Sequence, residues 1–419
     1  QYNTALGAEA LTNNTTASSN TAVGYQSLYT NTTGASLSAV GVGALYANTT
    51  GSNNVAMGTS SLVSNTTGAS NTGLGRDALR SNTTASNNTA VGHQAAYNNT
   101  TGTENTTLGR VSLLTNTTGN ENTAIGSVAL YYNTTGSNNV AVGRQALNNN
   151  TTASNNTAVG FQALLANTTG TANTAIGRNS LQANTTADDN TASGMYSLYT
   201  NTTGASNTAH GRSALFSNTT GSSNVSVGAQ ALENNTTAGN NVAVGYQAGF
   251  SNTTGAQNTM LGNTAGRSAT TGSYSTFLGR DSGYYITTGT KNVILGSYNG
   301  NQGSLDIRTS NSNIVLSDGD GNPRVHVDSN GKTFVGPENT NNATFHVHSL
   351  SNYWTAILYN LSNSDVTNVL CRHHWATGSN TATQISFRQS NGNEVGSIKS
   401  NGSSTSYNTS SDYRLKENV

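Results

Sequence analysis

This chain has little of what usually builds a globular protein. Of its 419 residues, 33% are apolar and 8% are charged, and it contains two prolines and one cysteine. The single cysteine, Cys371, excludes an intrachain disulfide framework and is expected to be a small buried hydrophobic residue. Such a composition is typical of a disordered chain, because too little apolar surface is available to offset the entropy lost on folding.

An excess of one charge sign and long apolar runs are missing as well. Lys and Arg together number 17, as do Asp and Glu, so the formal net charge is zero. Nucleic-acid binding needs a basic stripe, and a membrane-spanning helix needs about 18 consecutive apolar residues. The sequence therefore predicts neither a nucleic-acid partner nor insertion into a membrane.

What the chain has instead is a strict repeat. A glycine recurs every 17 residues from Gly7 to Gly296 without a slip. A short period without insertions predicts a solenoid whose coils stack directly on one another. Apolar residues at fixed phases of the coil would then form a continuous core. At a strand spacing of roughly 4.8 Å per coil, this shaft would be about 80 Å long.

The positions of the coil, counted from this glycine, predict a parallel β-strand just before it. Position −1 is Val, Ile, Leu or Met except at Ser193 and His210, position −3 is Thr, Ser or Val, and position −2 is mostly Ala. Positions −3 and −1 share one strand face, and position −2 and the glycine share the other. Neither face carries charge, so one is expected to fill the coil and the other to contact another chain. The small Ala and Gly residues would let a second backbone approach, unless they simply fit a narrow coil.

The second half of the coil carries Leu at position +4 and then Asn-Thr-Thr-Gly. Asn and Gly tolerate left-handed backbone, so this segment is expected to form the turn. Its asparagines should stack into a hydrogen-bonded side-chain ladder, for example Asn116, Asn133, Asn150 and Asn167. Asn-Thr-Thr is also a glycosylation sequon, but the ladder explains the motif without a glycan.

The last copies of the repeat change their core residues. Position −2 becomes bulky and position +4 becomes glycine, at Met260, Phe277 and Ile294 and at Gly249, Gly266 and Gly283. Repeat arrays need atypical terminal units. We therefore expect a capping transition at this end of the shaft.

After Gly296 the period ends, and the chain predicts short antiparallel strands. Asn330-Gly331 between alternating runs indicates a hairpin, and the run 384–388 also alternates like a strand. Asp318-Gly319-Asp320-Gly321-Asn322 resembles part of a calcium loop but lacks the later glutamate, so it predicts a turn. The expected division is a shaft over 1–296, a hairpin-rich neck over 297–340, a small β domain over 341–408 and a final segment over 409–419.

Candidate sites outside the repeat are few. His346 and His348 lie on one face of an expected strand. If three chains met on an axis there, six imidazoles could bind one metal ion octahedrally, and the alternative is a pair of exposed polar histidines. No other cofactor is expected. Carboxylates are sparse, their adjacent pair Asp188-Asp189 falls in a turn of the repeat, and no phosphate-binding loop is present. The sequence therefore predicts no enzyme acting on an external substrate.

The Asn-Thr-Ala-Val-Gly motif resembles the repeat of trimeric autotransporter adhesin heads. The 17-residue repeat of this chain is a few residues longer than is usual in those heads. The resemblance covers residues 1–296. It implies a left-handed parallel β-roll in which three chains pack together.

A second resemblance involves Gly396-Ser397-Ile398, Asn401-Gly402 and the C-terminal residues Thr405 to Val419, which read TSYNTSSDYRLKENV. They resemble the junction that enters the intramolecular chaperone of endosialidase-type phage tail spikes and fibres. In that family the chaperone assembles the trimer and then cuts itself off. The resemblance implies cleavage between Ser411 and Asp412, with Ser411 as the nucleophile.

Together these features predict an all-β protein with a trimeric parallel β-solenoid of 17-residue coils and a small antiparallel β-rich C-terminal region. The expected function is that of a homotrimeric phage tail fibre, located in the virion and outside the cell. It would bind other tail proteins and a glycan or protein receptor of the host surface, with receptor contacts in 297–408. The alternative is a trimeric adhesin on a bacterial cell surface, and a polysaccharide depolymerase and an ice-binding solenoid rank below it.

Overall fold

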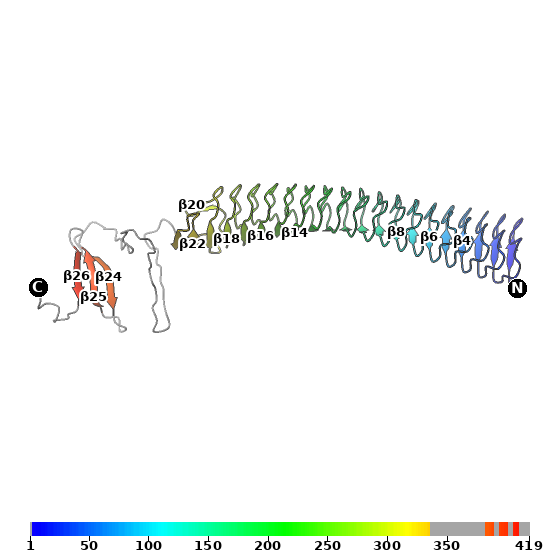
Figure 1. Ribbon diagram of the computed structural model, residues 1–419, viewed down its shortest axis with the longest axis horizontal. Helices are drawn as coiled ribbons and strands as arrows, with labels where there is room; N and C mark the ends of the chain where they lie inside the picture. Colours follow the sequence, from blue (N-terminus) through cyan, green and yellow to red (C-terminus); the bar gives the residue numbers. More distant parts are fainter. Residues whose placement is uncertain (1, 336–381, 389–393, 401–404, 410–419) are drawn as a thin grey trace, which may run out of the picture. The chain divides into compact units, whose positions relative to one another are not determined.

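The computed structural model describes residues 2–335, 382–388, 394–400 and 405–409, and all regular elements within them are β-strands. The chain divides into two units, Gln1–Thr344 and Phe345–Val419. The first is a parallel β-solenoid whose coils follow one another along a single axis (Figure 1). The predicted solenoid of 17-residue coils is confirmed. The described part contains no helix that could cross a membrane.

Each of the 18 coils contributes one three-residue strand at positions −3 to −1, as the repeat predicts. Each strand but the last pairs in parallel with the residues 17 positions further on, for example Ala158 with Ala175. The strands of the shaft are β1 (Thr4–Leu6), β2 (Thr21–Val23), β3 (Ser38–Val40), β4 (Val55–Met57), β5 (Thr72–Leu74), β6 (Thr89–Val91), β7 (Thr106–Leu108), β8 (Thr123–Ile125), β9 (Val140–Val142), β10 (Thr157–Val159), β11 (Thr174–Ile176), β12 (Thr191–Ser193), β13 (Thr208–His210), β14 (Val225–Val227), β15 (Val242–Val244), β16 (Thr259–Leu261), β17 (Thr276–Leu278) and β18 (Val293–Leu295).

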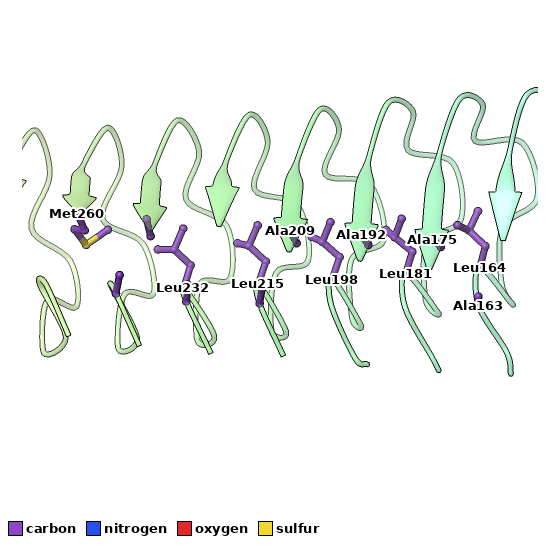
Figure 2. Packing of buried hydrophobic residues seen from close by; sticks show 14 of the residues in the cluster. Ala163, Leu164, Ala175, Leu181, Ala192, Leu198, Ala209, Leu215, Leu232 and Met260 are labelled. Carbon is purple, nitrogen blue, oxygen red and sulfur yellow. The ribbon is translucent and has the colours of Figure 1, made fainter. Parts of the chain in front are cut away.

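The core is a double column of small and large apolar side chains. From the second coil onward, alanines at position −2 and leucines at position +4 are fully buried and stack along the axis, as Figure 2 shows for Ala175 and Leu181. Burying one leucine stabilises the fold by about 1.5–3 kcal/mol. The expectation that the small-residue face of the strand meets another chain was wrong. In every coil with leucine at position +4, position −2 is Ala, Gly, Ser or Thr, because the two side chains share one narrow interior, and positions −3 and −1 are partly or fully exposed.

The backbone turns at positions that the sequence did not indicate. In the coil that starts at Gly143, the left-handed residues are Gln145 (φ 60°), Leu147 (φ 50°) and Asn155 (φ 62°). The Asn-Thr-Thr-Gly segment was expected to supply these conformations, and that expectation was wrong. A leucine in left-handed backbone costs roughly 1–2 kcal/mol, which its complete burial offsets.

The repeated glycine itself is required by both backbone angle and space. Gly160 has a φ of 137°, and a Cβ there would lie 2.5 Å from the carbonyl oxygen of Gly177. L-residues with a side chain rarely adopt this angle. The glycine that recurs every 17 residues therefore marks a point where the backbone of the next coil leaves no space for a side chain.

The predicted asparagine ladder is confirmed. The side chains at position +7 are buried, and each Nδ2 donates to the Oδ1 of the preceding coil without a break from Asn14 to Asn252, at 2.7–3.2 Å. Asn150, for example, donates to Asn133 and to the carbonyl oxygen of Ala153. Complete burial of these carboxamides leaves no room for a glycan on them.

A second asparagine column, at position −4, holds the backbone before the strands, with Leu37 and Ser275 as its two exceptions. Asn156 donates from Nδ2 to the carbonyl oxygen of Gly170 at 2.9 Å, and its Oδ1 accepts from the backbone N–H of Asn173 at 2.9 Å. Each such side chain therefore links two coils and fixes the entry of the next strand.

In the core of the last coils the large and small positions are exchanged: position −2 carries the large side chain and position +4 is glycine. A Cβ at Gly249 would lie 2.7 Å from Cε of Met260, and one at Gly283 would lie 2.8 Å from Cδ1 of Phe277. The bulky residue at position −2 therefore fills the space that leucine occupies in earlier coils. Buried Tyr298 closes the core, and its hydroxyl donates to the carbonyl oxygen of Leu305 at 2.7 Å. This arrangement confirms the expected capping transition.

The strands that follow Gly296 extend the same sheet. β21 (Ile314–Ser317) pairs in parallel with β18 at a step of 21 residues, and β22 (Pro323–Val327) and β23 (Thr333–Val335) add antiparallel strands. β19 (Asn301–Gln302) and β20 (Leu305–Asp306) form a separate hairpin. The hairpin predicted at Asn330-Gly331 is confirmed.

The second unit contains one described sheet. β24 (Ala382–Arg388), β25 (Glu394–Ser400) and β26 (Thr405–Thr409) pair antiparallel in sequence order. The predicted antiparallel C-terminal region is therefore confirmed, and the predicted strand over 384–388 lies within β24.

Candidate functional site

The shaft presents two contrasting surfaces, and the first is the outward face of its strands. Positions −3 and −1 of β1 to β18 include no Asp, Glu, Lys or Arg. Large apolar side chains on this face are open to solvent, such as Leu108 at 49% and Ile176 at 45% exposure. A long uncharged face on which exposed apolar side chains alternate with threonines is characteristic of an interface.

The second surface carries the side chains just after each glycine and in the turn that follows, at positions +1, +2, +5 and +6. Aromatic rings stack there from coil to coil, with centroids 5.3 Å apart for Tyr29 and Tyr46 and 5.1 Å apart for Tyr199 and Phe216. The guanidinium of Arg267 lies 5.5 Å from the ring centroid of Tyr284. Rings and cations here stabilise one another and stay accessible.

A hollow of about 410 Å³ lies on this second surface at the C-terminal end of the shaft. Its principal lining residues are Arg280, Asp281, Tyr284, Tyr285, Gln302 and Asp320. The rings of Tyr284 and Tyr285 meet edge to face, with centroids 4.8 Å apart and planes at 76°. The Arg280 guanidinium lies 3.1 Å from the Asp281 carboxylate, so one cation and one anion already compensate each other in the wall.

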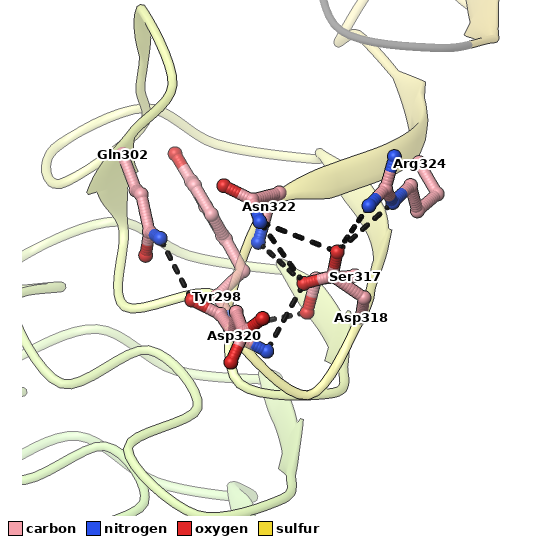
Figure 3. Close-up of polar contacts among 7 residues, drawn as sticks. All are labelled: Tyr298, Gln302, Ser317, Asp318, Asp320, Asn322 and Arg324. Carbon is pink, nitrogen blue, oxygen red and sulfur yellow. Dashed lines mark hydrogen bonds and ion pairs between the residues drawn. The ribbon is translucent and has the colours of Figure 1, made fainter.

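One side of this hollow is formed by the loop 317–322, which Asp318 holds in shape (Figure 3). Its Oδ1 accepts from the backbone N–H of Asp320 at 3.1 Å and of Asn322 at 2.9 Å, and its Oδ2 accepts from Nε of Arg324 at 3.0 Å. The Asn322 N–H first and the Arg324 guanidinium second lower the pKa of the Asp318 carboxyl to about 2.

These bonds confirm the turn predicted for Asp318–Asn322. Both carboxylate oxygens of Asp318 are engaged with protein donors rather than turned toward a common cation site. Gln302 anchors the loop from the opposite side, since its Nε2 donates to the carbonyl oxygen of Asp320 at 2.8 Å. The carboxylate of Asp320 lies at the rim of the hollow.

A second hollow, of about 530 Å³, lies on the same surface further toward the N-terminus. Its lining includes Gln94, Arg110, Tyr131, Tyr132, Gln145 and Asn148. Tyr131 and Tyr132 again meet edge to face, with centroids 4.6 Å apart and planes at 74°. Both hollows are therefore built around a tyrosine pair at positions +5 and +6.

The site residues expected from the sequence lie outside the described residues. This holds for His346, His348, Ser411 and Asp412, so a metal ion and a self-cleavage junction stay predictions. Within the part of the chain that the structure describes, no group of three or more His, Cys, Asp and Glu side chains is placed to hold a metal ion.

The tyrosine-pair hollows were missed by sequence reasoning, although the sequence contains a signal for them. Tyr-Tyr occurs in this chain at 131–132 and 284–285 alone, and both pairs fall at the same phase of the repeat. Comparison of the chain with protein-family models, curated proteins and solved structures found no match.

Proposed function

We propose that the chain is a homotrimeric fibre of a phage tail that reaches for and binds a receptor on the host surface. The observation that carries this proposal is the uncharged outward strand face, which runs along all 18 strands of the shaft. A strip about 80 Å long and about 10 Å wide, the length of three strand residues, presents on the order of 800 Å². That area matches the share of one partner in a standard interface, about 800 Å².

The partner for such a face is another copy of the chain. An apolar residue recurs on this face in every coil except those of Ser193 and His210, so a complementary surface must have the same length and period, and a second copy has both. Three copies are proposed from the resemblance to trimeric autotransporter heads. The resemblance of 405–419 to a chaperone junction favours a phage fibre in the virion and a single self-cleavage at Ser411-Asp412.

The proposal is tested by the molar mass in solution and the intact mass of the expressed protein. A trimer of 43.0 kDa chains, each shortened near Ser411, is the expected result. A trimer that is not cut favours the bacterial adhesin, and a stable monomer overturns both.

A substitution pair locates the interface. Ile176→Asp places a carboxylate on the outward strand face and should yield monomers, because an unpaired charge would be buried between chains. Thr186→Asp lies on an exposed turn of the next coil and should leave the trimer intact. Equal behaviour of the two variants would place the interface elsewhere.

A further inference from the structure

The two tyrosine-pair hollows share more than a dipeptide. Tyr132 and Tyr285 are separated by 153 residues, nine whole repeats, so their side chains leave the shaft on the same surface. Both rings are about half exposed, at 50% and 49%. Edge-to-face contact with the preceding tyrosine holds each ring in place while part of it stays open to solvent. A single such hollow could arise by chance, but two of the same construction indicate one kind of ligand.

The chemistry of the walls selects the ligand class. Ring faces carry negative electrostatic potential and contact the C–H face of a sugar ring well. Side-chain amides surround the rings in both hollows, from Gln302 in one and from Gln94 and Gln145 in the other. Amides donate and accept hydrogen bonds equally, which suits hydroxyl groups. The combination of an aromatic platform with amide groups around it fits a saccharide.

The charges argue against an anionic ligand. In the C-terminal hollow, Arg280 faces Asp281 at 3.1 Å, and Asp320 adds a second carboxylate. In the N-terminal hollow, the charged lining residue is Arg110. Phosphate and polyanions are bound by clusters of cations. Neither hollow has such a cluster, so the fitting saccharide is a neutral one.

We propose that the two tyrosine-pair hollows are binding sites for a neutral surface polysaccharide, with Tyr132 and Tyr285 as the stacking platforms. The inference rests on the proposed function, because it names the receptor class of a fibre that attaches to a host. Nine coils at roughly 4.8 Å place the two sites about 43 Å apart along the shaft. A long polymer can occupy both sites at once, so it binds more tightly than its own short fragments.

The test uses the full chain and a printed panel of purified bacterial capsular polysaccharides and O-chains. We expect retention of at least one neutral polysaccharide, measured next by titration calorimetry with the polymer and its oligosaccharides. Tyr132→Ala and Tyr285→Ala should each weaken polymer binding about tenfold. The double variant should show no detectable binding of the polymer. Tyr285→Phe keeps the platform and should bind within threefold of the wild type.

Tyr274→Ala is the matched control, because Tyr274 is 58% exposed and lies outside both hollows. It should bind like the wild type. The proposal is overturned if the panel retains no neutral polysaccharide, if the double variant binds as well as the control, or if retention is confined to anionic polymers. Molar mass separates the two proposals: a monomer with tyrosine-dependent binding contradicts the fibre alone, and a trimer without it contradicts the saccharide sites alone.

Discussion

Replacing Asn150 with alanine interrupts the buried carboxamide ladder near its middle. The change removes three hydrogen bonds: from Asn150 to Asn133 at 2.8 Å, from Asn150 to the Ala153 carbonyl at 2.9 Å, and from Asn167 to Asn150 at 3.0 Å. The Ala153 carbonyl keeps a second donor in Asn139. The Oδ1 of Asn133 keeps none from the ladder, so one buried oxygen becomes unpaired.

The end of the ladder provides the matched control. Asn252 donates to Asn235 and to the Gly255 carbonyl, but its own Oδ1 is buried without a hydrogen-bond partner, because the next coil has Ala269 at this position. Asn252→Ala therefore removes two bonds and only moves the unpaired oxygen one coil back, to Asn235.

The magnitudes follow from this count. A buried hydrogen bond contributes about 1 kcal/mol net, and a newly unpaired buried oxygen costs about 1–3 kcal/mol. At the lower end of that penalty, Asn150→Ala should lower local stability by about 4 kcal/mol and Asn252→Ala by about 2 kcal/mol. The difference of about 2 kcal/mol corresponds to roughly 30-fold in an equilibrium constant.

Hydrogen exchange by mass spectrometry is the appropriate assay, because a long repeat array opens locally rather than in one transition. Amides of the coils around residue 150 should lose about 30-fold more protection in Asn150→Ala than those around residue 252 lose in Asn252→Ala. Equal losses, or a larger loss at residue 252, would refute the argument from the unpaired oxygen.

Two further predictions concern the C-terminal end of the shaft. The pKa of Asp318 is lowered from 3.8 to about 2, so its contribution to stability is fully present above pH 4 and is lost as the pH falls through 2. Exchange protection of β21 and β22 should therefore be lower in Asp318→Asn than in the wild type at pH 6, and the two should converge near pH 2; a difference that persists there would contradict the assignment. Phe277→Ala should cost about 3–5 kcal/mol, and adding Gly283→Leu should recover part of it by recreating the Ala and Leu pair of earlier coils, whereas Gly283→Leu alone should destabilise β17 in thermal unfolding. A double variant no more stable than Phe277→Ala would show that the two positions do not share one space.

The period alone predicted the parts of the fold that depend on stacking. In-register stacking turns each position of the coil into a column, so the strand before Gly160 and the ladder through Asn150 could be derived from one copy of the repeat. The outward face could not be derived in this way, because both strand faces are uncharged. The deciding fact is the left-handed backbone at Leu147, which turns its side chain into the coil and leaves room only for a small residue at position −2.

The C-terminal hollow could not be predicted from the repeat alone. Its wall combines coil residues such as Tyr285 with Asp320, which belongs to a loop outside the repeat. Only the fold of that loop around Asp318 brings the two together. The recurrence of Tyr-Tyr at one phase of the repeat was the available signal, and its meaning depends on knowing that positions +5 and +6 are exposed.

Stacking at a constant offset of 17 residues also gives the shaft no preferred number of coils. Each coil contacts only its neighbours, so loss or duplication of one repeat leaves register, core and ladder as they were. The length of the shaft therefore changes in steps of roughly 4.8 Å, one step for each coil. The distance between Tyr132 and Tyr285 changes by the same increment for each coil gained or lost between them. Evolution could therefore adjust this distance to polymers of different repeat length by adding or removing whole coils.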